Sequence, residues 1–209
     1  MRSARVVTRT ERSRSVPSER VAGAAMLKDL NILLGITGGI AAYKVVDLAS
    51  KLAAAGAGVR TVMTDSACQL VGPKSFEAVT RAPVYTSLWS DPRGHEAAHI
   101  SLADWAQIVV VAPATANILG KVAHGICDDL LSTTLCACWT SPLLFAPAMN
   151  DRMWANPAVA ANVEILKQRG VHIVGPASGR LACGTEGLGR MAEPSEILEA
   201  IAALVAENP

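Results

Sequence analysis

Two side chains of this sequence could take part in active-site chemistry. Cys183 lies in a stretch, residues 179–191, that is longer than most connections and too rich in glycine for regular structure, so we expect an active-site flap there. His99 precedes a strongly apolar run and could act as a base, although a structural role is the alternative for a single histidine. The sequence lacks the G-x-S-x-G pattern and gives no support to serine esterase chemistry.

A second group of residues is suited to holding an anion. Thr37, Gly38 and Gly39 follow an apolar run, and glycines there let backbone amides at a helix start approach a phosphate, although a tight turn is the alternative. The run T-D-S at residues 64–66 ends the next expected strand. Its hydroxyls suit a phosphate or a ribityl chain, while Asp65 leaves an NAD site open.

Two further runs follow buried strands. Thr115, Ala116 and Asn117 leave room for a flat ring, and the Asn117 amide could meet the polar edge of that ring. The alternative is that Thr115 only caps the next helix. Asn150 is expected to be either a ligand-binding amide or a helix N-cap, and the sequence alone does not separate these roles.

The spacing of apolar residues predicts the elements that position these groups. The expected strands are residues 31–36, 58–64, 107–112, 143–146 and 171–174. The expected helices are centred on residues 45–52, 116–123, 128–138, 157–169 and 194–207. The first strand, helix and strand require a right-handed parallel crossover, so we expect one α/β domain with a parallel sheet of about five or six strands.

Composition narrows the class of protein. The chain has 209 residues, 51% hydrophobic content and a net charge of +1, which favours one globular domain and argues against nucleic acid as a ligand. No apolar run approaches the roughly 20 residues of a membrane span. The five cysteines lack C-x-x-C spacing, so we expect a reducing, cytoplasmic location and no metal site.

The charge is unevenly distributed along the chain. Residues 1–20 hold six arginines and two glutamates, a net charge of +4, which leaves −3 for the remainder. Three interpretations of this segment stay open: a basic tail, an upstream start codon with Met26 as the natural start, and an organelle-targeting peptide. We expect residues 1–26 to be a disordered extension and residues 27–209 to form a single domain.

Five motifs in order resemble the homo-oligomeric flavin-containing cysteine decarboxylases, most closely those that act on phosphopantothenoylcysteine. The motifs are G-x-T-G-G-I-A-A-Y-K, H-I-x-L-x-x-W-A, P-A-T-A-N, P-A-M-N-x-x-M-W and L-A-C-G-x-x-G-x-G-R-M, between residues 35 and 191. The resemblance implies a flavodoxin-like or Rossmann-like three-layer α/β/α subunit in a trimer or a trimer-built dodecamer. The cofactor would be FMN, with FAD left open, in a pocket completed by a neighbouring subunit.

The resemblance also assigns roles to individual residues. Those expected to hold the cofactor are Thr37, Gly38, Gly39, Ile40, Thr64, Ser66, Thr115, Ala116, Asn117 and Ile118. His99 would be the essential histidine, Asn150 the ligand of the substrate carboxylate, with Met149 and Ala182 beside the substrate, and Cys183 the proton donor to the intermediate.

The implied reaction removes CO2 from a terminal cysteine. A saturated cysteinyl carboxylate cannot lose CO2 directly, because the negative charge of the resulting carbanion cannot be delocalised. Oxidation of the thiol carbon by flavin creates a thiocarbonyl group, which accepts this charge and yields an ene-thiolate. The preferred substrate is 4'-phosphopantothenoylcysteine, and the resemblance implies that the reduced flavin would return a hydride, and an acid a proton, to convert the ene-thiol to the aminothiol. The alternatives are the C-terminal cysteine of a ribosomally made peptide, a flavin prenyltransferase of similar fold, and a catalytically idle regulatory subunit.

Overall fold

A computed structural model describes residues 26–89 and 97–207 of the chain. The expectation of a disordered extension at residues 1–26 therefore lies outside the described residues, apart from Met26. Leu27, the second described residue, has a completely buried side chain in the core.

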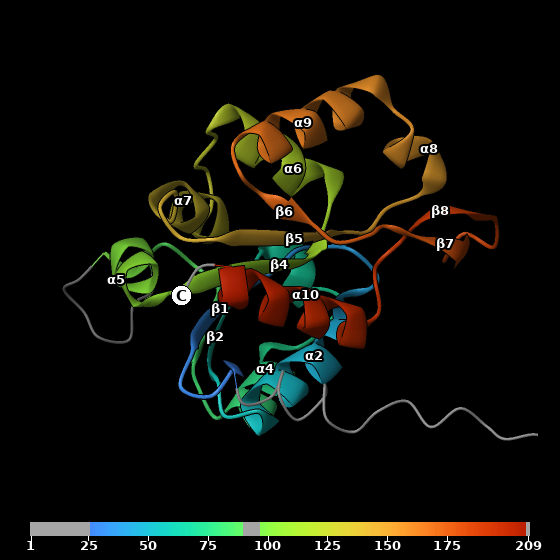
Figure 1. Cartoon of the computed structure of the whole chain (residues 1–209). Coiled ribbons are helices and arrows are strands. Elements are labelled where there is room, and N and C mark those ends of the chain that lie inside the picture. Colours follow the sequence, from blue (N-terminus) through green and yellow to red (C-terminus); the bar gives the residue numbers. More distant parts are fainter. Residues whose placement is uncertain (1–25, 90–96, 208–209) are drawn as a thin grey trace, which may run out of the picture.

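The centre of the fold is a six-stranded parallel sheet with the order β3-β2-β1-β4-β5-β6 (Figure 1). Its strands are β1 (Asn31–Ile36), β2 (Gly58–Met63), β3 (Val84–Tyr85), β4 (Ile108–Ala114), β5 (Leu143–Pro147) and β6 (His172–Ile173). All seven residues of β4 are buried, as its β-branched run predicts for a central strand covered on both faces. With the two-residue β3 left out, the strand order is that of flavodoxin; with β3 included, it is the Rossmann order.

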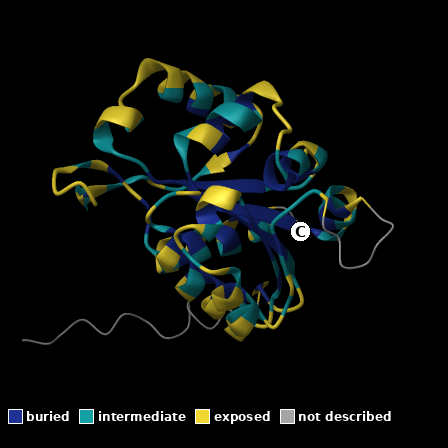
Figure 2. Ribbon diagram, turned by 180° about the vertical axis from the view of Figure 1, so that it is seen from behind, coloured by how far each residue is buried: buried dark blue, intermediate teal, exposed yellow. Residues whose placement is uncertain are grey.

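Helices cover both faces of the sheet, which gives the three layers of an α/β/α fold (Figures 1 and 2). On one face the core joins α2 (Ala42–Ala54), α4 (Pro73–Thr80) and α10 (Pro194–Glu207) to the sheet. On the other face it joins α5 (Ala98–Trp105), α6 (Ala116–His124), α7 (Leu130–Ala137) and α9 (Pro157–Gln168). The predicted fold class is confirmed, including the parallel sheet and its number of strands.

The glycine-rich stretch near the C-terminus differs from the prediction. It forms an antiparallel hairpin of β7 (Ala177–Arg180) and β8 (Glu186–Arg190), so the expectation that it lacks regular structure is wrong. The glycines serve close packing: a side chain at Gly189 would collide with the Met149 carbonyl oxygen, and a Cβ at Gly187 would lie 2.8 Å from Asp151 Cβ. The hairpin therefore docks on the start of α8 (Asp151–Trp154), held by a hydrogen bond of 2.9 Å from Met149 N to Gly189 O.

The loops that follow β1, β2, β4 and β5 lie at one edge of the sheet, because parallel strands all end at the same side. The short helix α3 (Asp65–Cys68) begins in the loop after β2, and α8 begins in the loop after β5. No helix in the described part of the chain is long and apolar enough to cross a membrane.

Candidate functional site

Two adjoining cavities open at the carboxyl edge of the sheet. The first has a volume of about 650 Å³ and the second about 570 Å³, both within the range of small-molecule sites. They share Gly38, Thr115, Ala116 and Met153, so a molecule in one can contact a molecule in the other.

The residues predicted to hold a cofactor lie together at these cavities. Eight of them line the first cavity: Thr37, Gly38, Thr64, Ser66, Thr115, Ala116, Asn117 and Ile118. The other two, Gly39 and Ile40, line the second cavity, next to the shared glycine.

Thr37 joins the ends of the two central strands. Its buried hydroxyl donates to the Pro113 carbonyl at 2.5 Å and accepts from the Thr115 backbone N–H at 3.2 Å. Because a hydroxyl has one proton, Thr37 fixes the geometry of the two loops and has no second proton for a ligand. This loop would therefore bind an anion through its backbone N–H groups.

The approach of the loop after β1 to the loop after β2 requires glycine. A Cβ at Gly38 would collide with Ser66 Cβ, so Gly38 lets these two loops close on the first cavity. Thr64 is the N-cap of α3, and its side-chain oxygen accepts from Ala67 N at 3.2 Å.

The alternative role for Thr115, a simple helix cap, is wrong. Thr115 occupies the N-cap position of α6, but its side chain makes no capping hydrogen bond. The first amides of α6 therefore lack a side-chain acceptor, and α6 begins at the wall shared by both cavities. An uncapped helix start with its positive dipole end at a cavity favours an anionic or electron-rich ligand.

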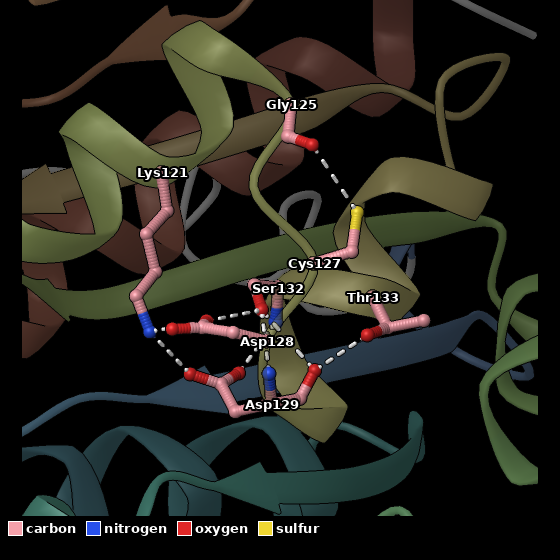
Figure 3. A network of polar contacts seen from close by, with 7 residues as sticks. All are labelled: Lys121, Gly125, Cys127, Asp128, Asp129, Ser132 and Thr133. Carbon is pink, nitrogen blue, oxygen red and sulfur yellow. Dashed lines mark hydrogen bonds and ion pairs between the residues drawn. The ribbon is translucent and has the colours of Figure 1, made fainter.

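A charged network forms another wall of the first cavity (Figure 3). Lys121 Nζ lies 2.6 Å from Asp128 Oδ1 and 2.8 Å from Asp129 Oδ2. Asp129 also caps α7 with Ser132 in a capping box. Hydrogen bonding to Lys121 lowers the pKa of Asp128. Burial lowers the pKa of Lys121, but its bonds to the two carboxylates outweigh burial and raise it.

The second cavity contains the predicted substrate residues Asn150, Met149, Ala182 and Cys183. The Asn150 side chain does two things at once: its Oδ1 accepts from Arg152 N at 2.9 Å, as an N-cap of α8, and its Nδ2 donates to Cys183 Sγ at 3.2 Å. The two roles that the sequence left open for Asn150 are thus compatible, since they use different atoms of the amide.

Cys183 is an exposed thiol at the tip of the hairpin with two polar neighbours. Its Sγ lies 3.1 Å from Thr185 Oγ1 in addition to Asn150. Hydrogen bonds from the Thr185 side chain and backbone, and then from Asn150, lower the pKa of Cys183 below that of an ordinary thiol. Such a thiol is a better proton donor and a more readily formed thiolate than an isolated cysteine.

His99 lies apart from this group. It is the second residue of α5, which packs on α7, and His99 is absent from the described residues that line the two cavities. Figure 1 shows α5 and the β7–β8 hairpin at opposite ends of the molecule. Within one chain, His99 is not brought together with Asn150 and Cys183.

Residues 95–99 read H-E-A-A-H, the spacing of a zinc-binding motif, so the predicted absence of a metal needs separate evidence. The first two of these residues lie outside the described part of the chain. Among the described residues, no group of three or more His, Cys, Asp and Glu side chains could hold a metal ion. The absence of a metal site stays a prediction.

The sequence interpretation missed several residues that line the cavities. Residues 86–89, including the exposed Trp89, and Lys121 line the first cavity. Tyr43, Lys44, Arg180 and Arg190 line the second. These four residues of the second cavity belong to, or directly precede, two of the five motifs. The sequence of a motif does not indicate in which direction such a side chain points.

Comparison with known proteins gives the family. The flavoprotein family model matches residues 21–206. The bifunctional coenzyme A biosynthesis protein CoaBC of Bacillus subtilis is 48% identical over 174 residues, which cover 83% of this chain and 43% of the relative. Its counterpart in Escherichia coli is 44% identical over 169 residues, covering 80% of this chain and 41% of the relative. The chain thus spans less than half the length of these relatives.

Solved structures agree with this. A PPC decarboxylase mutant complexed with pantothenoylaminoethenethiol has a TM-score of 0.76 and 35% identity, covering 87% of this chain and 100% of that chain. The FMN-dependent cysteine decarboxylase SpaF has a TM-score of 0.73 and 38% identity, covering 87% and 98%. The chain belongs to the flavoprotein family, and its predicted membership of the flavin-containing cysteine decarboxylases is confirmed.

Proposed function

We propose that this chain is an FMN-dependent decarboxylase of a terminal cysteine carboxylate, with 4'-phosphopantothenoylcysteine as its substrate. The observation that carries the proposal is the contact between Asn150 and Cys183 in the second cavity, which adjoins the first cavity, where the cofactor is expected. The identity to CoaBC proteins and to a PPC decarboxylase supports the choice of substrate.

The residues at the first cavity fit FMN. Gly38 closes two loops in a way that a Cβ would prevent, and the start of α6 has no side-chain cap. The backbone amides of these loops would hold the phosphate and ribityl chain, and Thr115, Ala116, Asn117 and Ile118 would flank the ring. When bound, FMN supplies the two-electron oxidation that makes the cysteine carboxylate able to leave as CO2.

Asn150 would orient the substrate. Its Oδ1 is engaged by the backbone of α8, so Nδ2 is the atom that faces the cavity and can donate to a carboxylate. A neutral donor fixes the carboxylate without the full stabilisation of an ion pair, which would oppose loss of CO2.

Cys183 would return a proton to the ene-thiolate after decarboxylation. The thiol lies beside Asn150, and hence beside the carboxylate that Asn150 would hold. Its lowered pKa favours donation of the proton. The hairpin that carries Cys183 would also keep water away from the intermediate.

His99 would act in the pocket of a neighbouring subunit of a homotrimer or a trimer-built dodecamer. The reason is its place on α5, away from Asn150 and Cys183 of its own chain. An oligomer can bring α5 of one chain to the second cavity of the next.

A second candidate is decarboxylation of the C-terminal cysteine of a peptide, which the identity to SpaF favours. Incubation of FMN-loaded protein with 4'-phosphopantothenoylcysteine and with a cysteine-terminated peptide separates the two candidates by mass spectrometry. Loss of CO2 alone indicates the aminothiol, and loss of CO2 with two hydrogens indicates the ene-thiol. No mass change with either compound would contradict the decarboxylase proposal.

A further inference from the structure

The two cavities differ in charge. The first is lined by the carboxylates Asp65, Asp128 and Asp129 and by a single cation, Lys121. The residues lining the second cavity, all within the described part of the chain, include Lys44, Arg180 and Arg190 and no aspartate or glutamate. The charged side chains of the second cavity therefore favour an anionic group there, in addition to the carboxylate at Asn150.

The three cations of the second cavity are not equally compensated. Lys44 Nζ lies 2.9 and 3.2 Å from the two carboxylate oxygens of Glu193, and Arg190 Nη1 lies 3.4 Å from Glu193 Oε1. Arg180 forms no ion pair with any residue that the structure describes, although its register partner on β8 is Glu186. Glu193 thus pairs with both Lys44 and Arg190, whereas Arg180 has no carboxylate partner among the described residues.

The hairpin places both of its arginines at the second cavity. Arg190 Nε lies 3.4 Å from the position of a Cβ on Gly179, so its guanidinium crosses to β7 immediately before Arg180. Arg180 is three residues from Cys183 in the sequence, and both line the same cavity. The side chain of Arg190 is 42% exposed, which leaves its other N–H groups available to a ligand.

We propose that Arg180 and Arg190 form a subsite for a phosphate monoester on the substrate, at the end remote from the reacting cysteine. This inference rests on the proposed function, since it assumes that the cysteine end occupies Asn150 and Cys183. Guanidinium groups bind phosphate through paired, charge-assisted hydrogen bonds, and a phosphate monoester carries a charge of about −1.5 to −2 near neutral pH. A peptide chain offers no such group, so this subsite selects the phosphorylated small molecule over a cysteine-terminated peptide.

The test compares the binding of two compounds that cannot be decarboxylated, 4'-phosphopantetheine and pantetheine, to the FMN-loaded protein by titration calorimetry. We expect the wild-type protein to bind the phosphorylated compound at least about tenfold more tightly, the effect of one or two charge-assisted hydrogen bonds. The double variant Arg180→Gln/Arg190→Gln should bind both compounds equally. The matched control Lys74→Gln/Lys167→Gln removes the same charge from exposed side chains outside both cavities and should keep the wild-type difference.

A single variant and a turnover measurement complement the binding test. Arg180→Gln alone leaves the Arg190–Glu193 contact in place and should lose part of the preference, which controls for a misfolded hairpin in the double variant. Turnover of phosphorylated and unphosphorylated pantothenoylcysteine should show a KM difference that the double variant abolishes. If wild type shows no preference for the phosphorylated compound, or the double variant retains it, the subsite is wrong even where decarboxylation occurs; if binding behaves as expected without turnover, the decarboxylase proposal fails instead.

Discussion

Asn150 Nδ2 donates a hydrogen bond of 3.2 Å to Cys183 Sγ, although the two residues come from different elements, the loop after β5 and the tip of the hairpin. The opposite atom of the amide, Oδ1, is held by Arg152 N at the start of α8. The orientation of the amide is therefore fixed by the backbone, and the group next to the thiol is always a donor. A carboxylate that took this donor would replace the thiol as its partner and would lie beside it.

Replacing Thr185 should change the acidity of Cys183. Hydrogen bonds from Thr185 are the main cause of the lowered pKa of this thiol, so Thr185→Val should raise the pKa toward the ordinary value. At a fixed pH below that pKa, the variant then holds less thiolate and should react more slowly with iodoacetamide, because only the thiolate attacks. The measurement is the pH profile of alkylation of the Cys183 peptide, followed by mass spectrometry.

Thr185→Ser is the control for this prediction, because it keeps the hydroxyl. The alkylation profiles of the exposed Cys127 and Cys136 should be the same in all three proteins and serve as internal references. An unchanged Cys183 profile in Thr185→Val would show that the thiol owes its acidity to something other than Thr185.

Asn150→Asp should separate the capping role of Asn150 from its role in the cavity. A carboxylate keeps an oxygen for Arg152 N, so α8 and the thermal stability should change little. The same change replaces the donor with a negative charge, which repels the substrate carboxylate, and we expect kcat/KM to fall by about 100-fold or more. Asn150→Ala is the comparison: it should lose activity and also about 1 kcal/mol of stability through loss of the cap. Equal stability of the two variants would mean that the cap contributes nothing.

The central sheet was predictable because its longer strands are marked by apolar runs. β1 has the predicted bounds, and β4 and β5 differ from prediction by only one or two residues at their ends. The two-residue β3 was missed because so short a strand leaves no period in the sequence. The hairpin was missed because Gly187 and Gly189 were interpreted as a sign of irregular structure, whereas they make room for Asp151 and the Met149 carbonyl.

The site was predictable where a residue follows a strand of the central sheet. Thr37, Thr115 and Asn150 meet at one edge because parallel strands end there. The double use of the Asn150 amide could not be foreseen from the sequence. It depends on the orientation of the amide, which turns Oδ1 toward α8 and Nδ2 toward the hairpin. The cations Arg180 and Arg190 were missed for a related reason: only the docked hairpin shows that both line the cavity.

Gly38→Ala should abolish cofactor binding. The added Cβ would collide with Ser66 Cβ, and the loops after β1 and β2 must then separate at the first cavity. We expect the purified variant to lack the visible absorbance of bound flavin after reconstitution, with a loss of stability of about 1–3 kcal/mol from overpacking. Gly72→Ala is the matched control, because no atom lies within 4 Å of its added Cβ. Normal flavin binding by Gly38→Ala would show that this approach of the loops is not needed.

Lys121→Met should make the protein less stable at neutral pH and have less effect in acid. Asp128 has a lowered pKa in the folded protein, so its contribution is present above the unfolded value of about 4 and is lost as the pH falls through the lower folded value. Without Lys121, the neighbouring carboxylates of Asp128 and Asp129 also repel each other. The thermal midpoint of the flavin-free protein, measured at neutral pH and at about pH 3, should show a difference from wild type that shrinks in acid.

Lys74→Met is the control for this pH dependence, because the Lys74–Glu77 pair lies on the surface, with the Lys74 side chain 88% exposed. We expect its effect on the midpoint to be small at both pH values. A Lys121→Met effect that is constant with pH would mean that packing of the aliphatic stem, and not the ion pairs, stabilises this wall.

Mixed oligomers should recover activity that neither parent variant has. His99→Asn removes the proposed base on α5, and Asn150→Asp removes the proposed carboxylate ligand in the second cavity, so each homo-oligomer should be inactive toward the cysteine substrate. Because His99 lies away from the cavities of its own chain, a mixed oligomer can place an intact His99 beside an intact Asn150 of a neighbouring chain. Co-expression with two different affinity tags and tandem purification gives the mixed species, whose turnover is compared with each parent. Mixed oligomers that are as inactive as their parents would show that His99 and Asn150 must act from the same chain.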